Sequence, residues 1–484
     1  MRLNRHFDLQ SMCLNVIVGH LDFYVNANHF PEKYMAFFYR KYSDVLYHLL
    51  RERGIFCEKY MVWLLTPYWK DVTICRQLSD PKSILSKFKT YGQSVTSLDM
   101  TFSIIRPEML KALIFCVPHL THLDLSGTDF PSHVLACLQK LCPSLVKLNV
   151  SYCQNINDDV ILDMCQRCDD PNSFRLRHLD IFGTPVSANG IYAVLVKLNH
   201  LEVLRHHKLS KIFFKLHSHG LLPRFAYKLI EFEHFSSMTL KLKTILEAWI
   251  AFCPYIEKVA IYDTIDNEEF EQISKFLHLK ELEVKFNERG IYTTCHFNWF
   301  TAKGKHLTKL SLTNVKIDIV TLVSNCKNLE YLFFTDVYFT EFEKNALKSN
   351  SVLKCLKTLI LARVLFSDPA IFQAFQLLVS ISNLEELSIR YCRNVSEKVA
   401  NIILRSSSQL ELLDFSFTDI TIETLLPFFH CPKLSKLYID TCSHIPIRDH
   451  RLTKFTKTCD LGNTFSWHVD FWSNQDIECI PVRR

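Results

Sequence analysis

Residues 120–128, which read Leu120-Thr-His-Leu123-Asp-Leu125-Ser-Gly-Thr128, contain a pattern that returns through most of the chain. The spacing L-x-x-L-x-L places leucines on one side of a short strand, and the polar residues that follow are typical of a tight turn. The same pattern begins at Leu145, Leu176, Leu307 and Leu384. We therefore treat this stretch as the centre of one structural repeat.

The central positions of the repeats are regularly spaced. In the first half they are separated by 25, 25, 31 and 25 residues, and lie at Leu98, Leu123, Leu148, Leu179 and Leu204. In the second half the steps are 23, 28, 22, 27, 28, 26 and 24 residues, and the positions are Val259, Leu282, Leu310, Leu332, Leu359, Leu387, Leu413 and Leu437. A period of roughly 20–29 residues with this pattern is the signature of leucine-rich repeats. The sequence therefore predicts an α/β leucine-rich-repeat solenoid, a horseshoe preceded by a helical N-terminal cap.

Three regions follow from where the pattern is present. Residues 1–90 lack it and read as helical, and the repeats occupy residues 91–442. Within them, residues 205–254 are irregular, with Leu229-Ile-Glu-Phe232 as a candidate degenerate strand. Residues 443–484 contain no repeat, and we interpret them as a C-terminal cap or a loosely ordered tail.

Composition excludes several classes of function. The net charge of +6 is spread along the 484 residues, without a basic block or an RNP-type aromatic motif, which argues against nucleic-acid binding. No apolar run approaches the ~18 residues that span a bilayer, and the short apolar segment near the N-terminus lacks a cleavage site. We expect a soluble protein of the cytoplasm, the nucleus or both, with no membrane partner.

The 18 cysteines also indicate an intracellular protein. Several stand a few residues before a strand, where a thiol fills space as a small apolar side chain: Cys116, Cys142, Cys253, Cys326 and Cys431. This use suits a reducing compartment, in which disulfides do not persist.

The N-terminal segment contains the sharpest local motif. Leu9, Cys13 and Ile17 recur every four residues, so they form one slanted row on a helix. This row resembles the BC box, with which substrate receptors hold the elongin B–elongin C pair, and Phe30-Pro31 with Tyr34 resembles the cullin-2 box. Together they resemble a von Hippel–Lindau box. In such helix-in-groove recognition Leu9 would fill an apolar pocket and Cys13 would permit close approach.

The layout of box and repeats resembles the Zyg-eleven and Zer-one family of cullin-2 receptors over residues 8–442. The resemblance implies a substrate-recognition subunit that binds elongin B–elongin C through Leu9, Cys13 and Ile17, and cullin-2 through Phe30, Pro31 and Tyr34. An unknown protein substrate would be held on the repeats. The armadillo-like domain common in that family does not fit after the repeats, so its degron pocket is not assigned to residues of this chain.

Two alternatives remain open. Phe30-Pro31-Glu32 could open a degenerate F-box that binds the adaptor Skp-one, although the tryptophan-ended tail of that motif is missing. Alternatively, the row of Leu9, Cys13 and Ile17 packs against the solenoid, and the protein is a scaffold without a role in ubiquitin transfer.

The substrate face is expected on the strands, at the x positions of the pattern. These include His122, Asp124, Lys147, Asn149, His178, Asp180, Glu283, Ser311, Asp414 and Tyr438.

No catalytic, cofactor or metal site is predicted. The common nucleophile, phosphate-loop, zinc-protease and dinucleotide motifs are missing, so we do not expect an enzyme. Cys165 and Cys168 form a lone C-x-x-C without a second pair at zinc spacing, and read as convex-helix residues. Solvated histidines are favoured over a metal site for the irregular segment, which contains His206, His207, His217 and His219.

Overall fold

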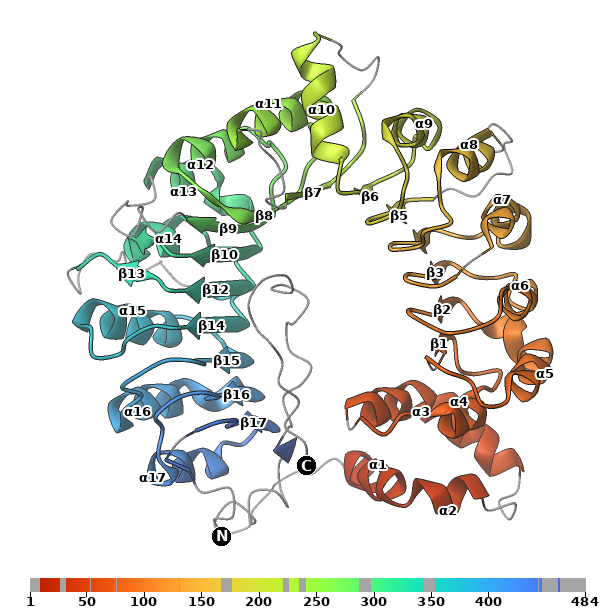
Figure 1. Ribbon diagram of the computed structural model, residues 1–484. Coiled ribbons are helices and arrows are strands. Elements are labelled where there is room, and N and C mark those ends of the chain that lie inside the picture. Colours follow the sequence, from red (N-terminus) through yellow and green to blue (C-terminus); the bar gives the residue numbers. More distant parts are fainter. Residues whose placement is uncertain are drawn as a thin grey trace. The chain divides into compact units, whose positions relative to one another are not determined.

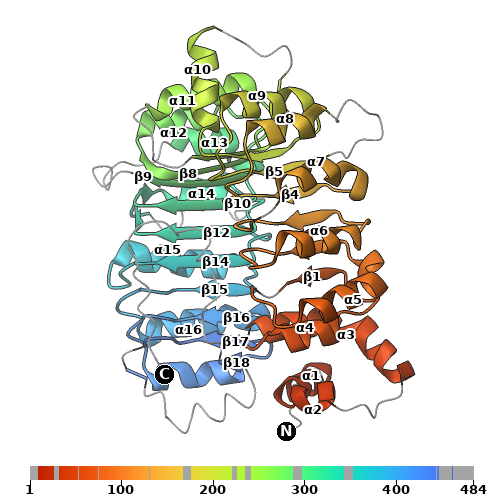
Figure 2. The same cartoon turned by 45° about the vertical axis from the view of Figure 1, so that its right-hand side comes forward.

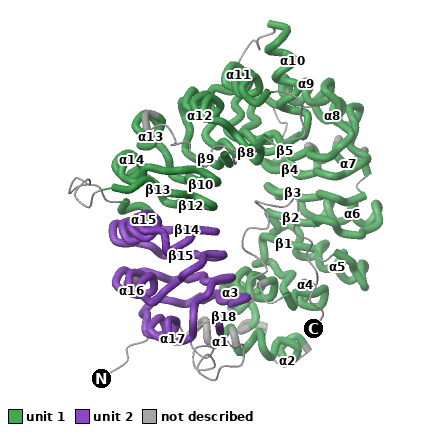
Figure 3. The backbone as a smooth tube through the Cα atoms, turned by 60° about the vertical axis from the view of Figure 1, so that its left-hand side comes forward, with its two compact units in different colours: residues 1–356 green, residues 357–484 purple. Residues whose placement is uncertain are grey.

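The computed structural model describes residues 9–26, 32–52, 54–74, 76–129, 131–166, 176–220, 226–234, 241–286, 297–342, 353–442, 444–445 and 460–461. The chain forms two compact units, residues 1–356 and 357–484 (Figure 3). The boundary between them falls inside the predicted repeat region 91–442.

Unit 1 begins with four helices and continues as strands that alternate with helices (Figure 1). The first helices are α1 Leu9–Gly19, α2 Leu21–Asn26, α3 Glu32–Glu52 and α4 Glu58–Leu64. The later helices are α5 Pro81–Tyr91, α6 Pro107–Phe115, α7 Ser132–Leu141, α8 Asp158–Gln166, α9 Ala188–Lys197, α10 Leu209–Ser218, α11 Leu242–Phe252, α12 Asn267–Ile273, α13 Phe297–Lys303 and α14 Ile319–Asn325.

The strands of unit 1 form parallel sheets in chain order. One sheet contains β1 Asp71–Thr73, β2 Ser97–Asp99, β3 His122–Asp124, β4 Lys147–Asn149, β5 His178–Asp180 and β6 Val203–Arg205. A second run contains β7 Glu231–His234, β8 Lys258–Ile265, β9 Glu281–Phe286, β10 Lys309–Thr313 and β12 Tyr331–Thr335. The short strands β11 Lys316–Ile317 and β13 Tyr338–Phe339 pair with each other.

Unit 2 has the same alternation of strand and helix. Its strands pair in chain order and are β14 Thr358–Ala362, β15 Glu386–Ser388, β16 Leu412–Asp414, β17 Lys436–Tyr438 and β18 Asp460–Leu461. Its helices are α15 Pro369–Ser380, α16 Glu397–Ser406 and α17 Ile422–Leu425. Each unit is a stack of leucine-rich repeats, as the sequence predicts.

The central leucines set the register of the sheets. Leu98 pairs with Leu123, and the same register continues through Leu148, Leu179 and Leu204. These leucines are at most 4% exposed. The helices α6–α9 lie along one side of the sheet in Figure 1 and come forward in Figure 2, and they shield its leucines from water. The opposite side, which we call the open face, carries the residues that flank the central leucines.

The strands β1 and β18 were not predicted: residues 443–484 were expected to contain no repeat, but Leu461 of β18 pairs with Leu437 of β17. Residues 1–90 were expected to be helical and without the repeat, but β1 pairs in parallel with β2 through Val72 and Leu98. Trp69, Val72 and Ile74 occupy the three leucine positions of L-x-x-L-x-L and are buried. Because all three substitutes are apolar, they fill the same core positions without matching the leucine pattern.

The irregular segment also contains a strand. Leu229 and Phe232 are buried, and β7 pairs with β8 so that Phe232 stands opposite Val259. The repeat pattern therefore passes through residues 205–254 with a phenylalanine at its centre.

Many of the strands lead into a sharp turn. In these repeats the residue four positions after the central leucine has a left-handed backbone, as Gly127 does after Leu123. Glycine accepts this conformation without steric cost. A Cβ added to Gly127 would also stand 2.2 Å from the ring of Phe102. The other residues with this conformation at the same position are Phe102, Tyr152, Gly183, Asn314, Asp336, Arg363, Tyr391, Phe417 and Thr441.

The cysteines whose side chains the structure describes form no disulfides with one another. Cys142, Cys253 and Cys326 are fully buried, as predicted, whereas Cys116 and Cys431 are half-buried. Burial raises the pKa of Cys142 and of Cys326 to about 12, so these thiols are protonated and serve as packing groups. Among the described residues no helix is both long and apolar enough to cross a membrane.

Candidate protein-interaction surfaces

The helix α1 turns one row of apolar side chains inward. Leu14 and Val18 are buried, together with Leu21 at the start of α2, and they define the face that packs against the rest of the chain. Cys13 is exposed, and Ile17 is half-buried between the two faces. Leu9 begins the helix, but its side chain lies outside the described residues. The predicted elongin row is therefore offset from the packing row.

Large apolar side chains are exposed on each of the helices α1, α2 and α3. Val16 of α1 is 58% exposed, Phe23 of α2 is 66% exposed and Phe37 of α3 is 65% exposed. Of the predicted cullin residues, Phe30 and Pro31 lie outside the described residues, as does the side chain of Tyr34 in α3.

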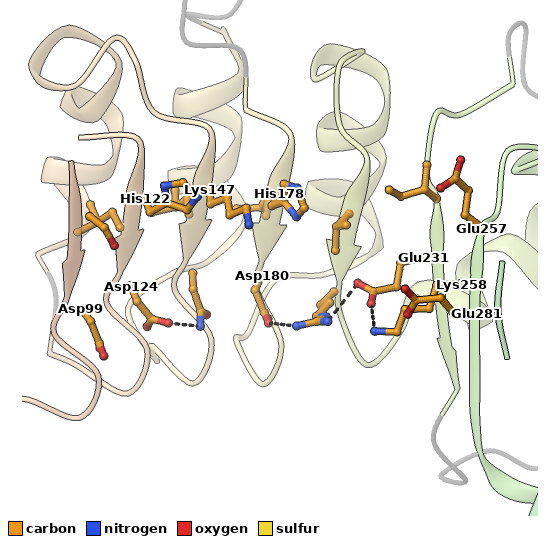
Figure 4. A pocket seen from close by; sticks show the side chains of 18 of the residues that line it. Asp99, His122, Asp124, Lys147, His178, Asp180, Glu231, Glu257, Lys258 and Glu281 are labelled. Carbon is orange, nitrogen blue, oxygen red and sulfur yellow. Dashed lines mark hydrogen bonds and ion pairs between the residues drawn. The ribbon is translucent and has the colours of Figure 1, made fainter. Parts of the chain in front are cut away.

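The open face of unit 1 contains a hollow of about 680 Å³. It is lined by residues of consecutive strands from β2 to β9 (Figure 4). Six predicted substrate-face residues come together there: His122, Asp124, Lys147, Asn149, His178 and Asp180. The hollow also takes in residues that the prediction did not name, among them Asp99, Arg205, Glu231 and Lys258. These residues occupy x positions of the repeat pattern, as the named residues do, and this position in the sequence could have identified them.

Two rows of side chains cross the β2–β5 part of the hollow. The basic row consists of His122, Lys147 and His178, which stand opposite one another on β3, β4 and β5. The acidic row lies two residues further along the strands and consists of Asp99, Asp124, Asn149 and Asp180. Figure 4 shows the two rows side by side.

The acidic row also has a structural task. A side-chain oxygen of Asp124 accepts a hydrogen bond from the backbone N–H of Ser126 at 2.9 Å, and Asn149 does the same for Ser151 at 3.0 Å. Asp99 and Asp180 make the corresponding bonds, at 3.0 and 2.9 Å. These bonds satisfy the turn that follows each strand. The sequence signal for this role was an Asp or Asn that stands two residues before the residue whose backbone N–H it binds.

Ion pairs concentrate at the β6–β8 end of the hollow. Arg205 lies 3.1 Å from Glu231 and 3.0 Å from Glu233, and Lys258 also pairs with Glu231. Burial opposes ionisation of Glu231, but Arg205 and Lys258 outweigh it and hold the pKa of this carboxyl below its usual value. This network neutralises most of the charge that its strands bring to the open face.

The histidines of the basic row resist protonation. Burial lowers the pKa of His122 and of His178, and the ammonium of Lys147 lowers both further. Asp71 acts in the opposite direction on His122, as Glu202 and Glu231 do on His178. At neutral pH Lys147 is therefore the main positive charge of this row.

The remaining predicted substrate residues do not join this hollow. Glu283 stands on β9 and Ser311 is buried on β10. Asp414 and Tyr438 belong to unit 2, where Asp414 accepts hydrogen bonds from the hydroxyl of Ser388 and the N–H of Ser416. Tyr438 is 8% exposed. Their regular spacing in the sequence placed them on strands but did not make them one site.

The histidine cluster is not uniformly solvated. His206 is buried and its Nδ1 accepts a hydrogen bond from the backbone N–H of Lys208 at 3.0 Å. Burial, with His207 and Lys208 nearby, lowers its pKa to about 3. His206 follows Leu201 and Leu204 at the third leucine position, so the repeat itself buries it; the expectation of a solvated ring was wrong here. His207 and His219 are exposed.

The C-x-x-C motif is described only at Cys165, which is buried in α8. Cys168 lies outside the described residues. Within the part of the chain that the structure describes, no group of three or more His, Cys, Asp or Glu side chains is arranged to hold a metal ion.

No family model and no curated protein matches the chain significantly. Solved structures that resemble it include the complex of Rad7 and Elc1 in yeast, with 13% identity over 91% of this chain and 95% of that one, at a TM-score of 0.44. An internalin from Listeria monocytogenes is 13% identical over 79% and 89% of the two chains, with a TM-score of 0.34. A leucine-rich-repeat protein from Leptospira interrogans is 15% identical over 84% and 98%, with a TM-score of 0.35. Likenesses this distant say nothing about what the chain binds.

Proposed function

We propose that this chain is a non-catalytic substrate-recognition subunit of a cullin-2 ubiquitin ligase, of the Zyg-eleven and Zer-one type, in the cytoplasm or nucleus. In this proposal α1 binds elongin C of the elongin B–elongin C pair through Leu9, Cys13 and Ile17. Phe30, Pro31 and Tyr34 favour cullin-2, and the repeats hold a protein substrate.

The observation that carries the proposal is the orientation of α1. Its inward row, Leu14 and Val18, already satisfies packing within the chain. Cys13 and Val16 face outward on the same helix. A helix with apolar groups on two faces is expected to bury both, and a partner groove can cover the outer one.

The neighbouring helices also expose apolar side chains that a protein partner could cover. Phe23 and Phe37 add two large exposed apolar side chains on α2 and α3. Aromatic side chains of this size supply much of the binding free energy at protein interfaces, because each buries a large apolar area.

The proposal predicts that Cys13→Arg weakens the binding of elongin C. An arginine at this exposed position would place a charge in an apolar groove, and we expect affinity for purified elongin B–elongin C to fall at least ~10-fold, equivalent to about 1.4 kcal/mol. Because Cys13 is exposed, the melting temperature should not change. Binding is measured by calorimetry with the full-length chain, and Leu9→Ser should weaken it as well.

The matched control is Cys355→Arg, which makes the same change at another exposed cysteine. It should bind elongin B–elongin C like the parent. If Cys13→Arg also binds like the parent, α1 is not the elongin helix. Recovery of Skp-one instead of elongin C from cells would favour the F-box alternative, and recovery of neither adaptor would favour a scaffold.

A further inference from the structure

The basic row is a set of three nitrogen-bearing side chains at one height of the sheet. His122, Lys147 and His178 occupy paired positions on three adjacent parallel strands. Neighbouring strands are ~4.8 Å apart, so a single carboxylate above Lys147 lies within reach of both imidazoles. All three side chains line the hollow (Figure 4).

Lys147 differs from the other lysines of the hollow. Lys258 pairs with Glu231, and Lys280 lies 2.8 Å from Glu257. Within the described residues Lys147 makes no ion pair, although it faces the same hollow. Its charge is therefore available to a ligand.

The acidic row offers the opposite charge at a fixed spacing. Asp124 stands two residues beyond His122 on β3, on the same face of the strand. That separation is ~6.6 Å along the strand. Two side chains on one face of an extended peptide, at positions i and i+2, have the same spacing.

We propose that the open face of β2–β5 binds an extended peptide segment that carries an acidic side chain and, two positions away, a basic side chain. The acidic side chain sits over His122, Lys147 and His178, and the basic side chain sits over Asp99 and Asp124. Asp180 already lies 3.9 Å from Arg205 and is not assigned to the peptide. This proposal deepens the proposed function by naming the class of substrate segment. It is tested without elongin C, so either proposal can fail alone.

The charge pattern favours a peptide over a nucleic acid. A phosphate backbone presents one negative charge after another, and some of these would face the carboxylates of Asp99, Asp124 and Asp180. A peptide with one charge of each sign matches both rows. It leaves intact the ion pairs of Arg205 with Asp180, Glu231 and Glu233, and that of Lys258 with Glu231.

Binding should take up protons. A carboxylate placed over the basic row favours the imidazolium forms of His122 and His178 and so raises their pKa values above those of the free protein. Other groups around them are Lys147 and Asp71 at His122, and Lys147, Arg177, Glu202 and Glu231 at His178. Peptide carboxylates stay ionised at pH 6, so affinity should rise as the pH falls from 7.5 to 6.

The test is a selection from a random nine-residue peptide display library on the immobilised full-length chain at pH 6.5. We expect the recovered pool to be enriched in acidic–x–basic pairs. Synthetic versions of the strongest peptides are then measured by fluorescence anisotropy at pH 6 and 7.5, with a three- to tenfold gain in affinity expected at pH 6.

Three variants locate the binding. Lys147→Gln should weaken the selected peptides at least fivefold, whereas Lys140→Gln, which removes the same charge from the exposed side of α7, should not. The double change of Asp99→Asn and Asp124→Asn removes charge but keeps the turn acceptor, as Asn149 shows. It should weaken the same peptides unless their basic residue is replaced by glutamine. His122→Gln with His178→Gln should remove the pH dependence.

The proposal is overturned by a pool without the charge pair, by the absence of any selected peptide, or by peptides that bind Lys147→Gln as tightly as the parent. Tighter binding of a 12-nucleotide single-stranded DNA that depends on Lys147 would also overturn it. Circular-dichroism melts of each variant show whether a loss of binding comes from unfolding.

Discussion

Glu283 is a carboxyl on β9 whose environment opposes ionisation. Burial raises its pKa to about 7 against the pull of Lys258, and the Glu233 carboxylate adds to the rise. Its folded-state pKa therefore lies above that of an unfolded chain, about 4.3. The folded protein binds the extra proton between these two values, so the contribution of Glu283 to stability is present below pH 4.3 and is lost as the pH rises through 7.

We expect Glu283→Gln to stabilise the protein at pH 8 relative to the parent, by on the order of 2 kcal/mol. At pH 4 the two proteins should be nearly equal, because the parent is then protonated as well. Urea unfolding at several pH values measures the difference. Glu271→Gln, on the exposed side of α12, is the charge-matched control, and a pH-independent difference for Glu283→Gln would contradict the assignment.

Residue-level roles were only partly predictable from the sequence. The x positions of the repeat correctly place His122 and Lys147 on the open face. They do not reveal that Asp124 and Asn149 hold turns, because that requires attention to the residue two positions later. They also miss the burial of His206, since an imidazole at a leucine position has no sequence pattern of its own.

At the level of single elements, the strand-to-turn transition is the most constrained part of each repeat. Gly127 combines a φ of +64° with close approach to the ring of Phe102. Gly54 has the same φ, but nothing lies within 4 Å of the position of an added Cβ. A substitution at Gly54 therefore measures the cost of the left-handed backbone alone, and one at Gly127 adds the cost of steric conflict.

Gly54→Ala should cost about 1 kcal/mol of unfolding free energy, from the left-handed backbone alone. Gly127→Ala should cost about 2–4 kcal/mol, because the new methyl group also displaces the Phe102 ring. Adding Phe102→Ala to Gly127→Ala should recover the steric part. Chemical denaturation of Gly54→Ala, Gly127→Ala and the double variant tests this. Equal costs at both glycines would show that the Phe102 ring moves aside without a cost in free energy.

Elements with leucine at their centre were predictable, and so were β7 and β8, which have Phe232 and Val259 there, whereas β1 was not. β3, β4 and β5 follow directly from the spacing of Leu123, Leu148 and Leu179. β1 escaped notice because Trp69, Val72 and Ile74 replace all three leucines. A pattern defined by burial rather than by leucine would include it.

For α1 the sequence indicated a helix with Leu9, Cys13 and Ile17 in one row. It could not show that Leu14 and Val18 form the inner face, because apolar residues surround most of this helix. The choice between the two rows depends on the packing of α1 against α3, which the pattern of α1 alone does not contain.

At the scale of the whole molecule, the two units each contain a core of stacked leucines. In repeat proteins each repeat gains stability chiefly from its neighbours, so the repeats of one compact unit are expected to unfold together. We therefore expect urea unfolding to proceed in two transitions, one for residues 1–356 and one for residues 357–484.

Leu123→Ala and Leu413→Ala assign the transitions. Both leucines are at most 2% exposed, one in each unit, and truncation should cost about 2–5 kcal/mol. Each variant should lower the urea midpoint of its own unit's transition and leave the other unchanged. The transitions are followed by circular dichroism and tryptophan fluorescence. A single transition that both variants shift equally would mean that the chain unfolds as one cooperative body.

The distribution of thiols has a practical outcome for anyone who purifies this protein. Maleimides and iodoacetamide need access, and among the described cysteines Cys13, Cys57 and Cys355 offer it while Cys142, Cys253 and Cys326 are shielded and protonated. Alkylating buffers would thus leave an adduct on the outer side of α1. Adaptor binding should accordingly be assayed under plain reducing conditions, and a fluorophore on Cys13 would report directly on whether anything covers that helix.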